Sequence, residues 1–230
     1  MTEGLILVPA KVRVRDTFLA PARLPGHLAG STPWLGVLLL STAIAILAIL
    51  AVPDEVFLEP MRGAVSRRGA PVEITSDPDV IVRWGRALGM LSTIGTHPVI
   101  AFVIAGLITI VFSLLGRGNG SFLEYLSLAS HGLLIPAFGT LILLAVTTVS
   151  RLTGHGDPFI RLDPESLGGG ILLSTFLSLD PFVIWMLIVL GIGVSHFDGR
   201  RGAMTATGIL LAGYLLFIAG ATTLLGGPAG

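Results

Sequence analysis

The sequence predicts an all-α membrane protein with five transmembrane helices in one bundle. Of its 230 residues, 53% are hydrophobic and only 12% are charged, whereas soluble domains carry about 25% charged residues. The mean hydropathy is +0.89. The apolar residues gather in runs near the roughly 20 residues that a helix needs to cross the hydrocarbon core of a bilayer. A water-soluble protein of this length could not bury so much apolar surface in its core, so lipid has to cover part of that surface.

Five apolar runs are bounded by polar or helix-breaking residues. The expected spans are residues 34–52, 94–115, 124–149, 181–196 and 203–225. Pro136 is expected to kink the third helix because proline lacks the N–H that a helix interior needs. The run 167–197 is too long for one straight span. We therefore expect a broken fourth helix, with a short helix, a break at Asp180 and then the fourth span.

Polar segments flank these spans. Residues 1–32 mix basic residues with short apolar stretches and show no signal-peptide core, so we expect a retained cytoplasmic N-terminal segment, followed by a transmembrane domain over residues 33–226. The first loop contains four prolines at positions 53, 60, 71 and 78. Within it, residues 79–91 are predicted to form a short amphipathic helix on the outer membrane surface, with apolar positions at Val80, Ile81, Trp84, Leu88 and Leu91.

Basic residues do not decide the orientation by number. With the N-terminus inside, seven basic residues fall in inner segments and seven in outer loops. The inner ones are Lys11, Arg13, Arg15, Arg23, Arg117, Arg200 and Arg201, and the outer ones are Arg62, Arg67, Arg68, Arg83, Arg86, Arg151 and Arg161. Long loops count for less and the first helix usually dominates. We therefore expect a cytoplasmic N-terminus and an external C-terminus in a plasma (inner) membrane.

Composition and motifs argue against several function classes. The chain has no cysteine and a formal net charge of +0, which removes disulfides and cysteine-ligated metals and gives no sign of a nucleic-acid partner. The signatures Gly-x-Ser-x-Gly and His-Glu-x-x-His are absent. We predict that the chain is not an enzyme and has no catalytic, cofactor-binding or metal site. A membrane enzyme would need side chains such as His97, His131, Glu124, Asp180 and Arg151 to meet in one cavity.

Two acidic residues and one histidine stand out in the apolar stretches. Asp180 is either a helix cap before Pro181 or an ion site within the membrane, and the cap is the more common role. Glu124 forms a capping box with Ser121. His131 lies within the third helix. Small residues at Gly191 and Gly193, at Gly208 and Ala212, and at Gly213 and Gly220 are expected to allow close helix packing, more often within the bundle than between copies.

Three stretches resemble the bacterial branch of the Yip1-domain membrane proteins. They are Phe18-Leu-Ala-Pro-Ala-Arg23, Gly120-Ser-Phe-Leu-Glu-Tyr-Leu126, and Leu179-Asp-Pro-Phe-Val-Ile-Trp185 running into Leu190-Gly191. The resemblance implies five spans and a cytosolic N-terminus, and makes Trp185 a candidate contact position. Eukaryotic relatives bind small GTPases and carry an Asp-Leu-Tyr-Gly-Pro stretch that is absent here, so that role is not carried over.

The sequence thus favours an integral membrane scaffold or accessory protein. It would act through helix and lipid contacts, with membrane lipids and other integral membrane proteins, or a second copy, as partners. Asp180, His131, Trp185 and Glu124 are the candidate polar or contact positions. The alternative is a small transporter or channel that uses Asp180 and His131 near the broken fourth helix, because discontinuous helices often mark binding sites at the midplane of a membrane.

Overall fold

A computed structural model describes residues 8–29, 32–54, 56–58, 77–153 and 180–225. The helices in these residues are α1 (Ala10–Leu19), α2 (Leu24–Leu28), α3 (Leu35–Ala51), α5 (Pro78–Ile108) with the π-helical η1 (Thr109–Leu115), α6 (Phe122–Gly132), α7 (Leu134–Leu152), α9 (Pro181–Asp198) and α10 (Ala203–Leu225). No strand occurs in the described part of the chain. The predicted all-α fold is confirmed.

Four helices are long and apolar enough to cross a membrane. They are Pro78–Leu115, Phe122–Ser150, Pro181–Asp198 and Ala203–Gly220. The apolar helix α3 has 17 residues, somewhat fewer than the roughly 20 of an ordinary span. These helices indicate a multi-pass membrane protein.

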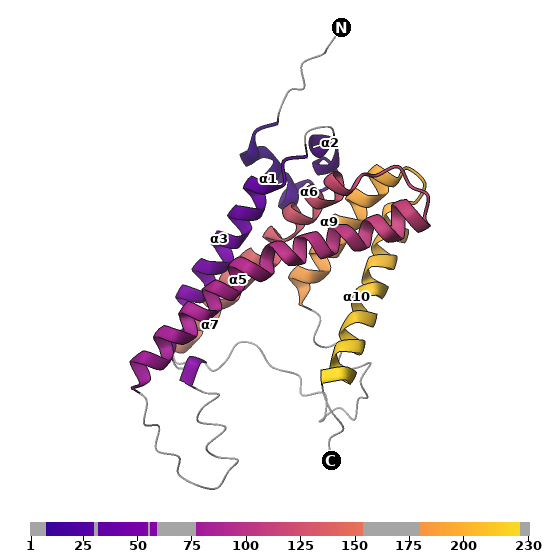
Figure 1. The fold of residues 1–230 in the computed structure, drawn as a ribbon. Helices are drawn as coiled ribbons and strands as arrows, with labels where there is room; N and C mark the ends of the chain where they lie inside the picture. Colours follow the sequence, from indigo (N-terminus) through magenta and orange to yellow (C-terminus); the bar gives the residue numbers. More distant parts are fainter. Residues whose placement is uncertain (1–7, 30–31, 55, 59–76, 154–179, 226–230) are drawn as a thin grey trace.

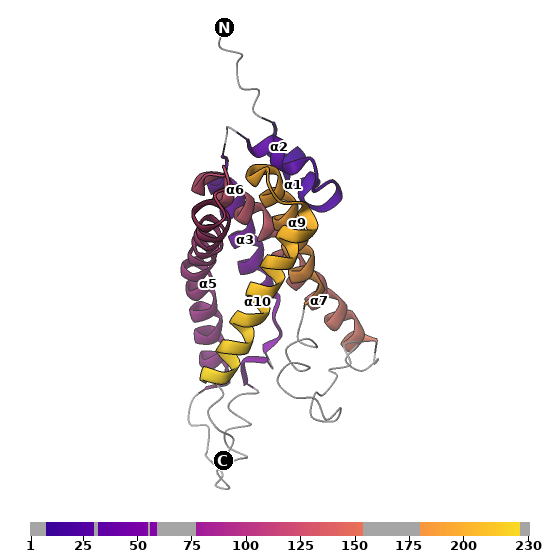
Figure 2. The same cartoon turned by 90° about the vertical axis from the view of Figure 1, so that its right-hand side faces the viewer.

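The helices form one bundle around a shared core. α3 packs against both α5 and α7, α6 packs against α5 and α9, and α10 packs against α9. The short helices α1 and α2 cover one end of the bundle, and α10 runs to the opposite end (Figure 1). Turned by 90°, the view in Figure 2 shows α7 and α10 diverging toward that opposite end.

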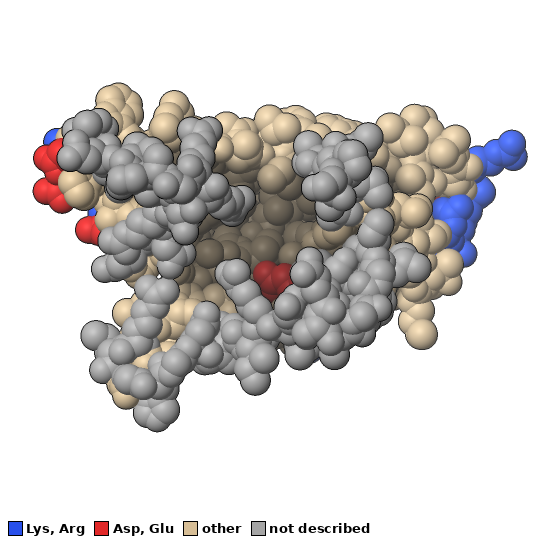
Figure 3. Space-filling model, turned by 90° about the horizontal axis from the view of Figure 1, so that it is seen from below, with Lys and Arg blue, Asp and Glu red and all other residues tan. Residues whose placement is uncertain are grey.

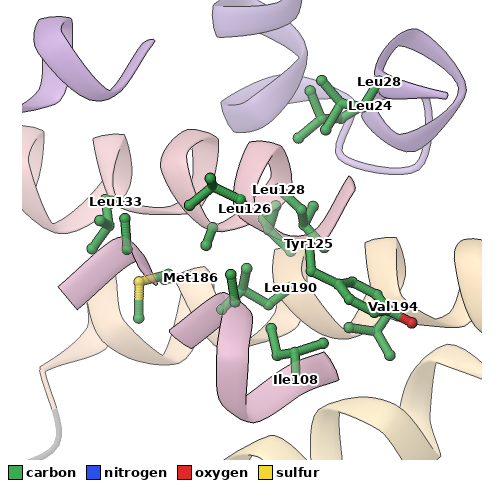
Figure 4. Packing of buried hydrophobic residues seen from close by; sticks show 14 of the residues in the cluster. Leu24, Leu28, Ile108, Tyr125, Leu126, Leu128, Leu133, Met186, Leu190 and Val194 are labelled. Atoms are coloured by element: carbon green, nitrogen blue, oxygen red, sulfur yellow. The ribbon is translucent and has the colours of Figure 1, made fainter. Parts of the chain in front are cut away.

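The largest buried cluster joins the N-terminal helices to the bundle. Leu24 and Leu28 of α2 have no exposed surface and lie against the side of α6 that carries Leu128 (Figure 4). The cluster also contains Ile108, Phe112, Tyr125, Leu126, Leu133, Met186, Leu190 and Val194. Burying a leucine side chain contributes about 2 kcal/mol. The N-terminal segment is thus docked onto the transmembrane bundle by the same apolar contacts that hold the spans together.

The predicted short surface helix at residues 79–91 is wrong as a separate element. It forms the first part of α5, which continues with η1 to Leu115. Nothing between Leu91 and Ile94 stops the helix, because Thr93 donates its hydroxyl hydrogen to the Gly89 carbonyl at 2.9 Å and so needs no outside partner. The second predicted span, 94–115, ends as expected but begins at Pro78 instead.

The continuous helix is longer than a membrane is thick. Its 38 residues extend for about 57 Å at 1.5 Å per residue, against about 40–45 Å for a bilayer with its headgroups. Trp84 and Leu88 on its first turns are 65% and 59% exposed. The start of this helix therefore either tilts within the headgroup layer or extends beyond it.

The third predicted span, 124–149, is divided near its proline. α6 ends at Gly132 and α7 begins at Leu134, so the kink expected from Pro136 occurs one turn earlier in the chain. Proline at position 136 cannot bond to the carbonyl of Gly132, which lies four residues before it, and its ring crowds that turn. The spans expected at 34–52, 181–196 and 203–225 match α3, α9 and α10 to within two residues at each end. The short helix expected within 167–179 lies outside the described residues.

The capping box at the start of α6 is confirmed. The Ser121 hydroxyl accepts from the Glu124 amide at 3.4 Å, and the Glu124 carboxylate accepts from the Ser121 amide at 2.8 Å. Two amides that have no partner within the helix are thereby satisfied.

We expect Ser121→Ala to destabilise the protein by about 1 kcal/mol, the usual loss on removing such a cap. Thermal unfolding in detergent would measure it. Ser121→Asp, which keeps an acceptor at the cap, is the control and should stay close to the original stability. Equal losses for both variants would contradict a capping role.

Candidate functional site

Asp180 begins α9 as a helix cap. Its Oδ1 accepts from the Phe182 amide at 2.8 Å, and Pro181 occupies the first helical position. The cap role predicted from the sequence is therefore confirmed. The side chain is partly exposed, so the carboxylate also keeps access to the space beside α9.

The start of α9 lies close to α10. Tyr214 of α10 is near enough to Asp180 for the charge of the carboxylate to act on its hydroxyl group. Seen from below, an acidic side chain is visible in a recess of the molecule (Figure 3). Asp180 therefore lies near α10 as well as at the start of α9.

His131 is fully buried on α6. Its Nδ1 lies 2.8 Å from the carbonyl oxygen of Ser127, which can only accept, so Nδ1 carries the hydrogen. In the neutral ring, Nε2 is then an acceptor, and it has no hydrogen-bond partner among the described residues. Arg13 of α1 lies near enough for its charge to act on this ring. His131 thus faces the N-terminal helix.

The N-terminal helix α1 turns its polar side chains inward. Arg13, Asp16 and Thr17 are buried, with Asp16 only 1% exposed. Asp16 forms an ion pair with Arg15 at 2.9 Å and lies 3.5 Å from Nδ1 of His27. Burial lowers the pKa of Arg13, but an arginine remains charged because its ordinary pKa is so high. The buried polar groups of α1 therefore bond mainly within the N-terminal segment, and Arg13 lies near His131 of α6.

Sequence reasoning missed this polar layer. The expected role of residues 1–32 was a basic segment at the inner membrane face. A signal was present, since positions 13, 16 and 17 are polar and share one helical face by their spacing of three and four. What the sequence could not indicate was that these polar residues become buried, while Val14 and Phe18 of the same helix pack against α3 and α7.

A second missed site joins two loops at the same end of the bundle. Asp198 is fully buried, and its Oδ2 accepts from Nη1 of Arg201 at 3.3 Å. Arg201 Nη2 also donates to the Gly116 carbonyl at 3.4 Å, and its guanidinium stacks 5.4 Å from the centre of the Phe112 ring. Gly118 is required here, since an added Cβ would lie 1.9 Å from Asp198 Oδ1. Asp198 lies beyond the end of the span 181–196 that the sequence predicts.

The four candidate positions do not form one site. Asp180 precedes Met186 by six residues, about 9 Å along the helix, and Met186 is the residue that packs against Gly132, next to His131. Glu124 lies near the other end of α9. The residue after it, Tyr125, packs against Phe197, with ring centres 6.1 Å apart. Phe197 and Asp180 are near opposite ends of α9, so Glu124 lies about 25 Å from Asp180 along this helix.

Two further candidates are held by other contacts. Trp185 is partly buried and packs against the main apolar cluster. His97, one of the side chains that a membrane enzyme would bring together, bonds instead through Nε2 to the Ser41 hydroxyl of α3 at 3.2 Å. Among the described residues there is no group of three or more acidic or histidine side chains that could hold a metal ion.

Comparisons with known proteins add no family. No family model matches the chain, no curated protein matches it, and no solved structure matches it. The resemblance to the Yip1-domain family therefore stays a prediction, and the function has to be argued from the residues and the fold.

Proposed function

We propose that this protein is an integral membrane scaffold of the Yip1 type, with α3 as a fifth span beside the four long apolar helices. It works by holding membrane partners through its outward apolar helix faces. The polar side chains in the bundle serve helix caps and interhelical contacts, as Asp180, Glu124 and His97 do. This use of polar groups favours a structural role over a chemical one.

The observation that carries the proposal is the exposure of α10. Only 6% of its 18-residue apolar window is buried in the bundle. Met204, Leu216 and Phe217 are 90%, 75% and 73% exposed, and an added Cβ at Gly208 would meet nothing within 4 Å. The exposed positions recur every fourth residue and so form one continuous face. A helix with this much free apolar surface suits contact with lipid and with other transmembrane helices.

Photocrosslinking from α10 tests the scaffold directly. A photoreactive residue is placed at Phe217 in native membranes, and a matched control is placed at Ala206, which is fully buried on the same helix. We expect one stoichiometric membrane partner to crosslink from position 217 and none from position 206. The partner should also co-purify in mild detergent and be lost with Leu216→Ala/Phe217→Ala. A lone chain that turns over a substrate or moves an ion across liposomes would overturn the proposal.

A small transporter is the second candidate, favoured by the partly exposed carboxylate of Asp180. Asp180 caps the start of α9. If the carboxylate binds a cation on its way through the membrane, its charge is needed in addition to its capping oxygen.

Two substitutions at Asp180 separate charge from capping. Asn caps helices about as well as Asp, so Asp180→Asn should leave unfolding unchanged, whereas Asp180→Ala should lose about 1 kcal/mol. In a transporter, Asp180→Asn would abolish ion flux in liposomes at full stability. Flux that survives this change would remove Asp180 from transport, and no flux in the original protein would leave the scaffold as the better account.

A further inference from the structure

One end of the bundle exposes mostly basic charge. Its fully exposed charged side chains among the described residues are Lys11, Arg15, Arg23, Arg117 and Arg200, which together we name the basic face. Asp16 and Asp198 at this end are 1% and 0% exposed and are paired with arginines. Glu124 is partly exposed, so the described part of this end keeps a net positive charge with one accessible carboxylate.

The opposite end carries mixed charge. Its described charged residues are Asp54, Asp77, Asp79, Arg83 and Arg86, and Arg86 is paired with Asp54 at 2.6 Å. Figure 3 shows the difference, with only Lys and Arg at the right-hand edge and Asp or Glu beside basic residues at the left-hand edge. Among the residues named here, the opposite end thus carries three acidic and two basic side chains, in contrast to the basic face.

The fold brings together the two loops that carry Arg117 and Arg200. These are the loops 116–121 and 199–202. Arg201, the neighbour of Arg200, joins them through the Gly116 carbonyl and Asp198. Arg117 and Arg200 are exposed, and neither forms a salt bridge with another described residue.

These two arginines mark the edge of the apolar surface. Leu114 and Leu115, immediately before the loop of Arg117, are 70% and 76% exposed, and Met204, which follows the loop of Arg200, is 90% exposed. The change from exposed apolar to exposed basic side chains therefore occurs within four residues on both segments. In a membrane protein, that boundary lies at the level of the lipid phosphates.

We propose that the basic face binds the phosphate groups of anionic phospholipids, with Arg117 and Arg200 at its centre. The inference rests on the proposed membrane placement and adds a lipid class to it. Lipid is favoured over nucleic acid because the arginines directly adjoin exposed leucine and methionine side chains, which acyl chains would cover. The first turn of α10 contains no acidic residue, so it adds no charge that would repel a phosphate.

The test compares lipid selectivity in full-length variants. The chain is placed in nanodiscs of mixed phosphatidylglycerol and phosphatidylcholine, and the bound lipids are measured by native mass spectrometry. Each basic residue near an anionic surface strengthens attraction about fivefold. We expect the original protein to retain phosphatidylglycerol preferentially and Arg117→Gln/Arg200→Gln to lose at least about tenfold of that preference. Arg83→Gln, at the opposite end, is the matched control and should keep it.

Further measurements separate the alternatives. Added inorganic phosphate should not displace the lipid if acyl chains contribute to binding, whereas displacement would indicate a free-phosphate site and overturn the lipid proposal. Equal retention of both lipids by the original protein, or an unchanged preference in the double variant, would also overturn it. Crosslinking of a membrane partner from position 217 is measured in the same variants. We expect the double variant to lose its lipid preference and still crosslink the partner. A protein that keeps its lipid preference but crosslinks no partner would contradict only the scaffold.

Discussion

Gly191→Ala is expected to separate α10 from α9 and to give one of the two largest losses of stability among the substitutions considered. An added Cβ would lie 2.7 Å from the Thr207 amide nitrogen and 2.8 Å from its Cα. Because these atoms belong to the backbone of α10, no side-chain rotation can relieve the overlap. Overpacking of this kind costs about 1–3 kcal/mol, and α10 depends on α9 for its packing.

The control is a glycine on α10 itself. At Gly213 an added Cβ would meet nothing within 4 Å, so Gly213→Ala should leave stability unchanged or raise it slightly, as alanine favours a helix by up to about 1 kcal/mol. Unfolding by sodium dodecyl sulfate in mixed micelles measures both variants. Similar stability for both would show that the close approach at Gly191 does not hold the two helices together.

Arg201→Gln is expected to give the other large loss. It removes the partner of a carboxylate that has no exposed surface, and it also removes the link to Gly116 and the stacking on Phe112. An unpaired buried charge costs about 3–5 kcal/mol. Arg201 is itself 28% exposed, so water can reach the site and reduce the cost of the unpaired carboxylate. We therefore expect the free energy of unfolding to fall by about 2–3 kcal/mol.

Two further variants identify the cause. Arg200→Gln changes an exposed neighbour of the same type and should leave unfolding within about 0.5 kcal/mol of the original. Asp198→Asn/Arg201→Gln removes the stranded charge, so the double variant should be more stable than Arg201→Gln alone. If adding Asp198→Asn made the protein still less stable, the ion pair would not be the source of the loss.

The local elements could be read from the sequence because their causes are local. Ser121 and Glu124 are three residues apart, and Asp180 directly precedes Pro181, so each cap is complete within one turn. The ends of α3, α9 and α10 follow from where apolar runs meet polar or helix-breaking residues. The errors arose where two signals competed. The predicted helices 79–91 and 94–115 are separated by Ser92 and Thr93, but a hydroxyl group can bond within its own helix, as that of Thr93 does.

The prediction that small residues pack within the bundle was partly right. Gly193 faces Leu128, where an added Cβ would lie 2.4 Å from its side chain, and Gly191 faces Thr207. Gly208 and Gly213, by contrast, have open space around them. Small residues allow close approach but do not determine which helix comes close, so the sequence could not distinguish these two pairs.

The sequence by itself determined the class of the protein, the positions of most helices and their caps, because hydropathy and capping act over one or two turns. The tertiary structure alone decided that α1 buries Arg13 and Asp16, and that Asp198 and Arg201 join two loops far apart in the chain. It also decided that an excess of exposed basic side chains among the described residues gathers at one end. Each of these depends on which surfaces meet when the helices pack, and the pattern of residues along a single helix does not contain that information.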